Sequence, residues 1–381
     1  MHFQALLVAA LLALANASQA QVMDCDIGGQ SVNPSHGGTT AGKTGLMRCV
    51  DRQTRELLRE EELRDGRFAG VKRWYEKGQL RREHSVNDKG NRDGRAREWN
   101  AQGVLVREGF EANSASIGLH REWFDSGKPK SMGHWGEAGG ERRNEAASRF
   151  EFNRDGQLTD LRCGREPRLE DEAKLCGHQG KQQVTELFTE RGQVASRVTY
   201  ERGQLLRQES YWDDGKLRFS EESNSERRVA RQFTRDGVLR KQIERRNGQR
   251  VLEQDYSERG TLAIEKRWSA GGGLEREDEW YLNGQPKRNI THEAGGDRTE
   301  RRFHDNGKLS WEGRYVQQDR GRSMPAGTHK SFDDSGRLRI ETVYDDKGRL
   351  ARERSWDEAG RVERDDEVFE DGSRKALGAR P

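Results

Sequence analysis

Hydrophobic and polar positions alternate along this chain, which is typical of β-strands with one partly buried face. Residues 194–200 and 338–344 show the pattern clearly, because modestly apolar side chains occupy one parity in each stretch. Glycine-marked turns separate such stretches every 11 to 12 residues over much of the chain. That length fits one strand plus its turn.

Each turn glycine lies in the same local frame. An aromatic residue precedes it by three or four positions and Leu or Val follows it by two, as in Trp212, Gly215 and Leu217. The residue before the glycine is often Asp or Asn, and Asp-Gly and Asn-Gly pairs supply the positive φ angles that tight hairpin turns require. These pairs begin at Asp155, Asp214, Asp236, Asn247, Asn283 and Asn306.

The turn glycines also define a repeat. From Gly192 to Gly307 the successive steps are 23, 22, 23, 24 and 23 residues, and a fixed period in this range indicates a repeat architecture. Helices are disfavoured, because each glycine would cost a helix about 1 kcal/mol. The sequence therefore predicts an all-β fold: an elongated antiparallel β-meander of 22–24-residue hairpin repeats, in a single-layer or shallowly curled sheet.

Composition agrees with a thin core. Of the 381 residues, 35% are charged and 31% hydrophobic, which argues against a doubly wound α/β enzyme with a large core. A disordered polyampholyte would match the composition, but it has no reason to keep aromatics in phase with glycines. The 69 basic and 66 acidic residues nearly cancel. We therefore expect no nucleic-acid partner, and interpret the charge runs as solvated sheet faces with cross-strand ion pairs.

The N-terminus resembles an export signal. Residues 5–15 are all Leu, Ala or Val, and a small-x-small site ends at Ala20. We interpret residues 1–20 as a cleavable signal peptide cut after Ala20, and predict a periplasmic protein. The rest of the chain has no apolar run long enough to span a membrane as a helix.

Four cysteines suit an oxidising compartment, and four allow three pairings. Local pairing of Cys25 with Cys49 and of Cys163 with Cys176 is favoured, because each pair lies in a segment outside the repeat frame. A zinc site formed by Cys163, Cys176 and His178 is the alternative, although the C-x₂₋₄-C spacing of structural zinc sites is missing.

Interruptions of the repeat predict the domain organisation. After the signal peptide we expect an irregular segment over 21–60, and a first β-repeat array over 61–160. A disulfide-closed insertion follows over 161–180. The second array covers 181–372, and residues 373–381 form a tail.

Catalytic motifs are scarce. Residues 37–44 satisfy G-x₄-G-K-T, a phosphate-binding pattern. That pattern requires a buried strand before it and a helix after it, and its polar surroundings favour a plain loop. The sequence contains no H-E-x-x-H or G-x-S-x-G, and its nine histidines are scattered. We expect neither catalysis nor a cofactor.

The unit aromatic-x-x-(D/N)-G-x-L, repeated every 22 to 24 residues, resembles the bacterial MORN-repeat variant, best over 65–160 and 181–320. Residues 344–350 also resemble a YD repeat of Rhs-type proteins. This MORN variant occurs in a family commonly labelled as antitoxins. For an exported member, the resemblance implies a periplasmic immunity protein that neutralises a toxin delivered to the envelope, for example a type VI secretion effector such as a phospholipase.

Aromatic residues in the first array are the candidate partner contacts, because aromatics are frequent interface anchors. Alternatively, they fill the inner face of the sheet itself. A second functional hypothesis is an envelope scaffold or a glycan-binding module. The candidate aromatics are Trp74, Tyr75, Trp99, Trp123 and Trp135.

Overall fold

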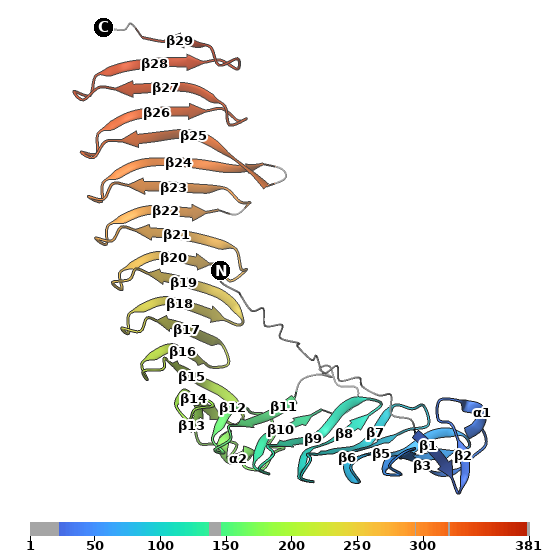
Figure 1. Cartoon of the computed structure of the whole chain (residues 1–381). Coiled ribbons are helices and arrows are strands. Elements are labelled where there is room, and N and C mark those ends of the chain that lie inside the picture. The colour runs from blue at the N-terminus through green and yellow to red at the C-terminus, as the bar shows by residue number, and fades with distance from the viewer. Residues whose placement is uncertain (1–22, 137–145, 294, 319–320, 379–381) are drawn as a thin grey trace, which may run out of the picture. The chain divides into compact units, whose positions relative to one another are not determined.

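The computed structural model describes residues 23–136, 146–293, 295–318 and 321–378 (Figure 1). The expected signal peptide lies outside these residues. The described chain is nearly all β-structure, as predicted, and its contacts divide it after Gly156 into two compact units.

Within the described residues, β1 to β12 form the first sheet, in the order β12-β11-β10-β9-β8-β7-β6-β5-β4-β3-β1-β2. Every strand pair with a defined register is antiparallel. The strands are β1 (Met23–Ile27), β2 (Gln30–Val32), β3 (Gly45–Asp51), β4 (Leu57–Arg64), β5 (Arg67–Glu76), β6 (Gln79–Val86), β7 (Arg92–Trp99), β8 (Leu105–Ala112), β9 (Ala115–Trp123), β10 (Pro129–Trp135), β11 (Ala146–Phe152) and β12 (Leu158–Arg162). A short helix, α1 (Gly37–Thr40), lies between β2 and β3.

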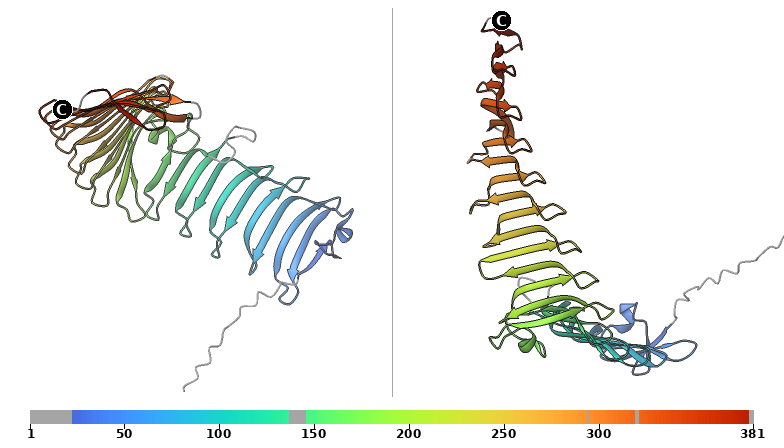
Figure 2. Two further views of the ribbon diagram at one scale, coloured as in Figure 1. Left: turned by 90° about the horizontal axis from the view of Figure 1, so that it is seen from above. Right: turned by 90° about the vertical axis from the view of Figure 1, so that its left-hand side faces the viewer.

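The second sheet contains β13 to β29 in chain order. Its strands are β13 (Gln183–Phe188), β14 (Val194–Glu201), β15 (Gln204–Tyr211), β16 (Leu217–Ser223), β17 (Arg227–Phe233), β18 (Leu239–Arg246), β19 (Gln249–Tyr256), β20 (Leu262–Trp268), β21 (Leu274–Trp280), β22 (Pro286–His292), β23 (Arg298–Phe303), β24 (Leu309–Gln318), β25 (Arg322–Phe332), β26 (Leu338–Tyr344), β27 (Leu350–Trp356), β28 (Val362–Val368) and β29 (Arg374–Ala376). Its strands fan out in the view from above (Figure 2), which is the twist expected of a sheet. The meander architecture is confirmed.

A five-residue turn joins most neighbouring strands. In residues 357–361, the amide of Asp357 donates to the carbonyl of Arg361 at 2.9 Å, and the amide of Gly360 donates to the carbonyl of Asp357 at 3.1 Å. The Asp357 carboxylate accepts the amides of Ala359 and Arg361, each at 2.9 Å. The side chain at the first turn position therefore caps the turn, while the glycine at the fourth, with φ of 78°, reverses the chain.

This geometry corrects the expected role of the Asp-Gly and Asn-Gly pairs. Of the six Asp or Asn residues before turn glycines, only Asn247 has a positive φ, of 48°. Asn247 and Gly248 form a two-residue turn between β18 and β19, where both central residues need positive φ. The other five residues lie in longer turns, in which the glycine alone takes that conformation.

The core is thin and local. In the first unit, Cys25, Val32, Met47, Cys49 and Leu63 form a buried cluster around the first disulfide. Residues 21–60 were expected to be irregular, but their described part contains β1 to β3 and the start of β4. The prediction was wrong because a disulfide and a small core stabilise these strands, and the glycine frame reveals neither.

The insertion in the second unit follows β12 and carries the other disulfide and α2 (Glu172–Leu175). Buried residues there include Leu169 and Cys176, and the hydroxyl of Tyr200 donates to the carbonyl of Leu161 at 3.0 Å. The expected tail is partly structured, since β29 pairs with β28. As an end strand of only three residues with Arg and Lys, β29 offers little template for another chain.

Candidate binding surfaces

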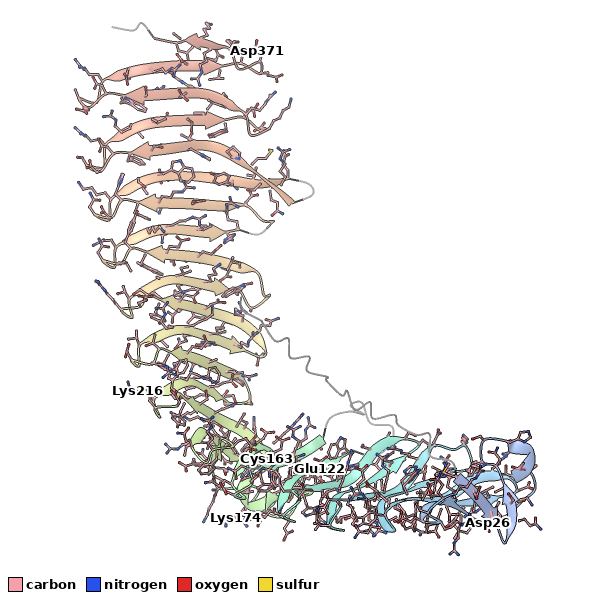
Figure 3. The ribbon with its side chains drawn as sticks, viewed as in Figure 1. Asp26, Glu122, Cys163, Lys174, Lys216 and Asp371 are labelled. Atoms are coloured by element: carbon pink, nitrogen blue, oxygen red, sulfur yellow. A yellow bond between two sulfur atoms is a disulfide. The ribbon has the colours of Figure 1, made fainter. Side chains whose placement is uncertain are left out.

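Side chains stand along the strands of both sheets (Figure 3), and one face of the first sheet carries a continuous ladder of arginines and glutamates. Arg48 Nε contacts Glu60 Oε1 at 3.1 Å, and the other oxygen of Glu60 lies 3.7 Å from Arg73 Nη1. Glu83 then joins Arg73 to Arg97, at 2.8 Å and 2.6 Å. Although burial opposes its ionisation, these two arginines hold the pKa of Glu83 below its usual value. The predicted cross-strand pairing is present here.

The second sheet has a polar ladder of its own. Arg231 Nε donates to Gln242 Oε1 at 2.8 Å, Gln242 to Gln254 at 3.2 Å, and Gln254 to Glu265 Oε2 at 2.6 Å. These residues lie directly opposite one another on β17 to β20. The neighbouring strands β17 to β20 are therefore joined by side-chain hydrogen bonds as well as by backbone ones.

The five candidate aromatics lie on two opposite faces of the first sheet. The hydroxyl of Tyr75 donates to Glu60 at 2.8 Å and the guanidinium of Arg97 stacks on Trp99, so these aromatics belong to the ladder face. Trp123 joins them by strand alternation. Trp74 and Trp135 lie on the other face. One flat partner surface can therefore cover either set, but not all five.

Trp74 and Trp135 flank a depression with two histidines. The ring of Trp74 packs on His84 at 4.8 Å, and that of Trp135 packs on His120 at 4.6 Å. Between the histidines the floor consists of Ala96 and Gly109. The walls carry charges of both signs: Arg82, Glu98, Arg107, Arg92 and Glu111. The cavity measures about 20 Å³, which is room for about one water molecule.

Both histidines of this depression favour the neutral imidazole. Burial, helped by Arg92, Lys72 and Arg82, lowers the pKa of His84 to about 4. Burial also lowers the pKa of His120, although backbone carbonyls oppose the shift. His120 Nε2 donates to the carbonyl of Phe110 at 2.9 Å. In the described residues no hydrogen bond reaches the ring of His84, so it presents a free neutral donor and acceptor beside Trp74.

The His120 arrangement recurs in the second sheet. His329 lies over Gly313 and its Nε2 donates to the carbonyl of Arg314 at 2.8 Å. The surrounding sequence also recurs: Leu-x-x-Glu-Gly begins at residues 105 and 309, and Gly-x-His-(Arg/Lys) begins at 118 and 327. Comparison of the two arrays residue by residue would have found this signal, which the turn-glycine period does not contain.

The disulfides join Cys25 to Cys49 and Cys163 to Cys176, the local pairs that the sequence favours. The alternative zinc site loses its thiolates, because both cysteines are oxidised. Glu172, Cys176 and His178 do lie close together, but the fully buried Glu172 carboxylate accepts the amides of Gly164, Arg168 and Leu169 at 2.7 to 2.9 Å. This cluster is a structural clasp for the insertion.

The G-x₄-G-K-T match does not have the arrangement of a phosphate-binding loop. Its first residues form α1 inside the motif, and the strand that precedes it, β2, is an end strand of three residues. Lys43 Nζ donates to Gln30 Oε1 at 2.5 Å. The segment is a surface turn in the first unit.

Two disulfides indicate that the chain matures in an oxidising, exported environment. Among the described residues both helices have four residues, so neither is long enough to cross a membrane.

Neither the family models nor the curated proteins contain a match to this chain. Solved structures give distant similarities. A crystal structure of TcdB2-TccC3-Cdc42 aligns with 88% of this chain and 18% of that chain, at 10% identity and a TM-score of 0.18. A Photorhabdus luminescens Tc holotoxin pore aligns with 86% of this chain and 23% of that chain, at 11% identity and a TM-score of 0.17. This chain thus spans about a fifth of their length, and likeness at this level supports no conclusion about its function.

Proposed function

We propose that this protein is a non-catalytic periplasmic immunity or antitoxin-like protein, which binds and neutralises a toxin delivered to the cell envelope. The observation that supports it is that the first sheet carries an ion-pair ladder on one face and ordered aromatic contacts on the other. Such a surface suits contact with another protein across many strands of the sheet. The resemblance to the MORN-repeat variant of antitoxin families adds the expectation of a toxin partner, for example a type VI secretion phospholipase.

Within the first sheet, the Trp74–Trp135 face is the proposed contact. On the opposite face Tyr75 and Trp99 are already engaged by Glu60 and Arg97, whereas the ring of His84 keeps its polar atoms available. A toxin loop that covers the two tryptophans would bury them as anchors, surrounded by the charged walls. Neutralisation would follow from occlusion of the toxin's active site.

The test is co-expression of the exported chain with the product of the adjacent gene. We expect survival of the producing cell and co-purification of the two proteins. Trp74→Ala and Trp135→Ala should weaken the complex, while Trp99→Ala, on the other face, is the matched control. If the wild-type chain neither protects nor co-purifies, the immunity function is wrong.

A glycan-binding or scaffolding role is the second candidate, and the indole rings of Trp74 and Trp135 on one face favour it, because sugar rings stack on aromatic side chains. Saturable binding to peptidoglycan or lipopolysaccharide that Trp74→Ala abolishes would support this role over the first.

A further inference from the structure

A second candidate site lies in the second sheet, far from the sequence-predicted aromatics along the chain. A cleft of about 510 Å³ opens across β22 to β24 and is lined by Tyr281, Lys287, Arg288, Arg302, Phe303 and Ser310. A volume of this size is within the range of ligand pockets. Three of these six residues are cationic and two are aromatic.

One buried carboxylate fixes two of the cations. Glu300 is 1% exposed, and its Oε1 accepts Arg288 Nε at 2.9 Å and Arg302 Nε at 2.8 Å. Although burial opposes ionisation, the two arginines hold the pKa of Glu300 below its usual value. The guanidinium of Arg302 also stacks on Trp311, 4.8 Å from the ring centre. In the described residues its Nη atoms make no hydrogen bond, so a fixed guanidinium edge stays available at the cleft.

Strand irregularities add the remaining polar groups. Glu279 pairs with Arg288 and Trp280 with Pro286, so Lys287 is an extra residue in β22. In the same way, Ser310 is an extra residue of β24 between the partners of Arg302 and Phe303. Bulges of this kind redirect side chains locally. The same extra residue follows most five-residue turns of this sheet, and in β22 and β24 it is Lys287 and Ser310, which line the cleft.

The balance of charge favours an anionic occupant. Lys287 and Arg288 share Glu279, at 3.6 Å and 3.3 Å, and Arg288 and Arg302 share Glu300. Three cations thus face two carboxylates, one of which is buried beneath them. Beside the cleft, the turn after Tyr281 carries Leu282, which is 75% exposed. An acidic side chain next to an apolar one matches both features.

We propose that this cleft binds an acidic segment of a protein partner, with a carboxylate on Arg302 and Lys287 and an adjacent apolar side chain against Tyr281 and Phe303. The proposal rests on the protein-binding function proposed above, and it names a second contact on the partner. Guanidinium and carboxylate groups pair strongly when the arginine is held in place beforehand.

Calorimetry on the full exported chain can test this with the peptide acetyl-Glu-Leu-Glu-Phe-amide, its Gln-for-Glu analogue, and citrate. We expect the acidic peptide to bind, and Arg302→Gln and Lys287→Gln each to weaken it about tenfold. Lys287→Gln leaves the buried Glu300 untouched, so it separates binding from folding. Arg267→Gln is the matched control, since Arg267 Nε is anchored on the buried Glu265 at 2.6 Å outside the cleft. It should not change the affinity.

Equal binding of the acidic and neutral peptides would overturn the proposal, and so would equal weakening by Arg267→Gln. If citrate binds as tightly as the peptide, the occupant of the cleft is a free anion and the proposed protein segment is wrong. The outcome is separable from the immunity test. If the Lys287→Gln variant still co-purifies with the partner unchanged, the cleft is not a contact with that partner, while the proposed immunity function stands.

Discussion

The imidazole of His329 lies over Gly313, and there is no room for a side chain between the strands at that point. A Cβ added to Gly313 would stand 2.6 Å from the His329 ring and 2.7 Å from the Trp311 ring. The register of β24 and β25 shifts between Glu312 and Arg314, and His329 Nε2 binds the carbonyl of Arg314 at this irregularity. The glycine thus leaves the space that the imidazole needs to hydrogen-bond a backbone carbonyl where the strand register shifts.

Gly313→Ala should therefore destabilise this part of the second sheet. Because His329 is only 4% exposed, its ring cannot move outward without loss of its hydrogen bond, and we expect a cost of about 1–3 kcal/mol. Repeat sheets unfold locally, so hydrogen exchange of β24 and β25 is the measurement. Gly271→Ala, where the new Cβ meets only Ser269 Oγ at 3.7 Å, should leave exchange unchanged. Equal protection in both variants would contradict this account.

The pKa of His84, about 4, makes the stability of the first sheet depend on pH. The unfolded chain binds this proton near pH 6.5, well above the folded pKa. The stability that depends on neutral His84 is therefore fully present above pH 6.5 and is lost as the pH falls toward 4. We expect a loss of about 1 kcal/mol after solvent screening. Proton NMR of the imidazole should show a midpoint near 4, and His84→Gln should flatten urea stability between pH 6.5 and 5. A midpoint above 6 would contradict the prediction.

Glu300→Gln tests the buried carboxylates of the second sheet. The change leaves the shape but removes the charge that Arg288 and Arg302 share, so we expect a loss of about 2–3 kcal/mol. Because the pKa of Glu300 is lowered from 4.5, this contribution is present above pH 4.5 and is lost as the pH falls further. Glu186→Gln is the control, since Glu186 is 41% exposed and pairs with Arg197; it should cost below about 1 kcal/mol. Urea denaturation compares the two, and equal losses would show that burial adds nothing.

Much of the fold follows from local sequence, because the meander is built from contacts between consecutive strands. A strand beside its sequence neighbour needs only an alternating pattern and a turn, and the glycine frame marks both. The backbone conformation of Asp214 or Asn283 is harder to predict from the local sequence. The same Asp-Gly or Asn-Gly pair occurs in two-residue and five-residue turns, and the turn length decides which residue has positive φ.

The sites were harder to predict than the strands. Trp74 and Tyr75 are adjacent in one strand, so alternation alone already places them on opposite faces. The cleft could not be predicted, because its lining combines side chains from several successive strands, and the glycine frame does not show which of them approach one another. The extra residues Lys287 and Ser310 each lie three positions after a turn glycine, as in most five-residue turns of this sheet, so the glycine frame marks the bulges but not the cleft.

The oxidised pair Cys163–Cys176 makes a final prediction that separates a clasp from a metal site. A thiol reagent should not react with the denatured chain before reduction. After reduction it should modify four cysteines. Exchange of Cys163 and Cys176 to serine should cost about 3 kcal/mol locally. Hydrogen exchange should then rise in α2 and at the start of β13, while β5 to β8 stay protected. The Cys25 and Cys49 double variant should reverse this pattern by exposing β1 and β3. Bound zinc with reactive thiols in the native chain would instead restore the metal-site interpretation, because thiolates, unlike a disulfide, can hold zinc.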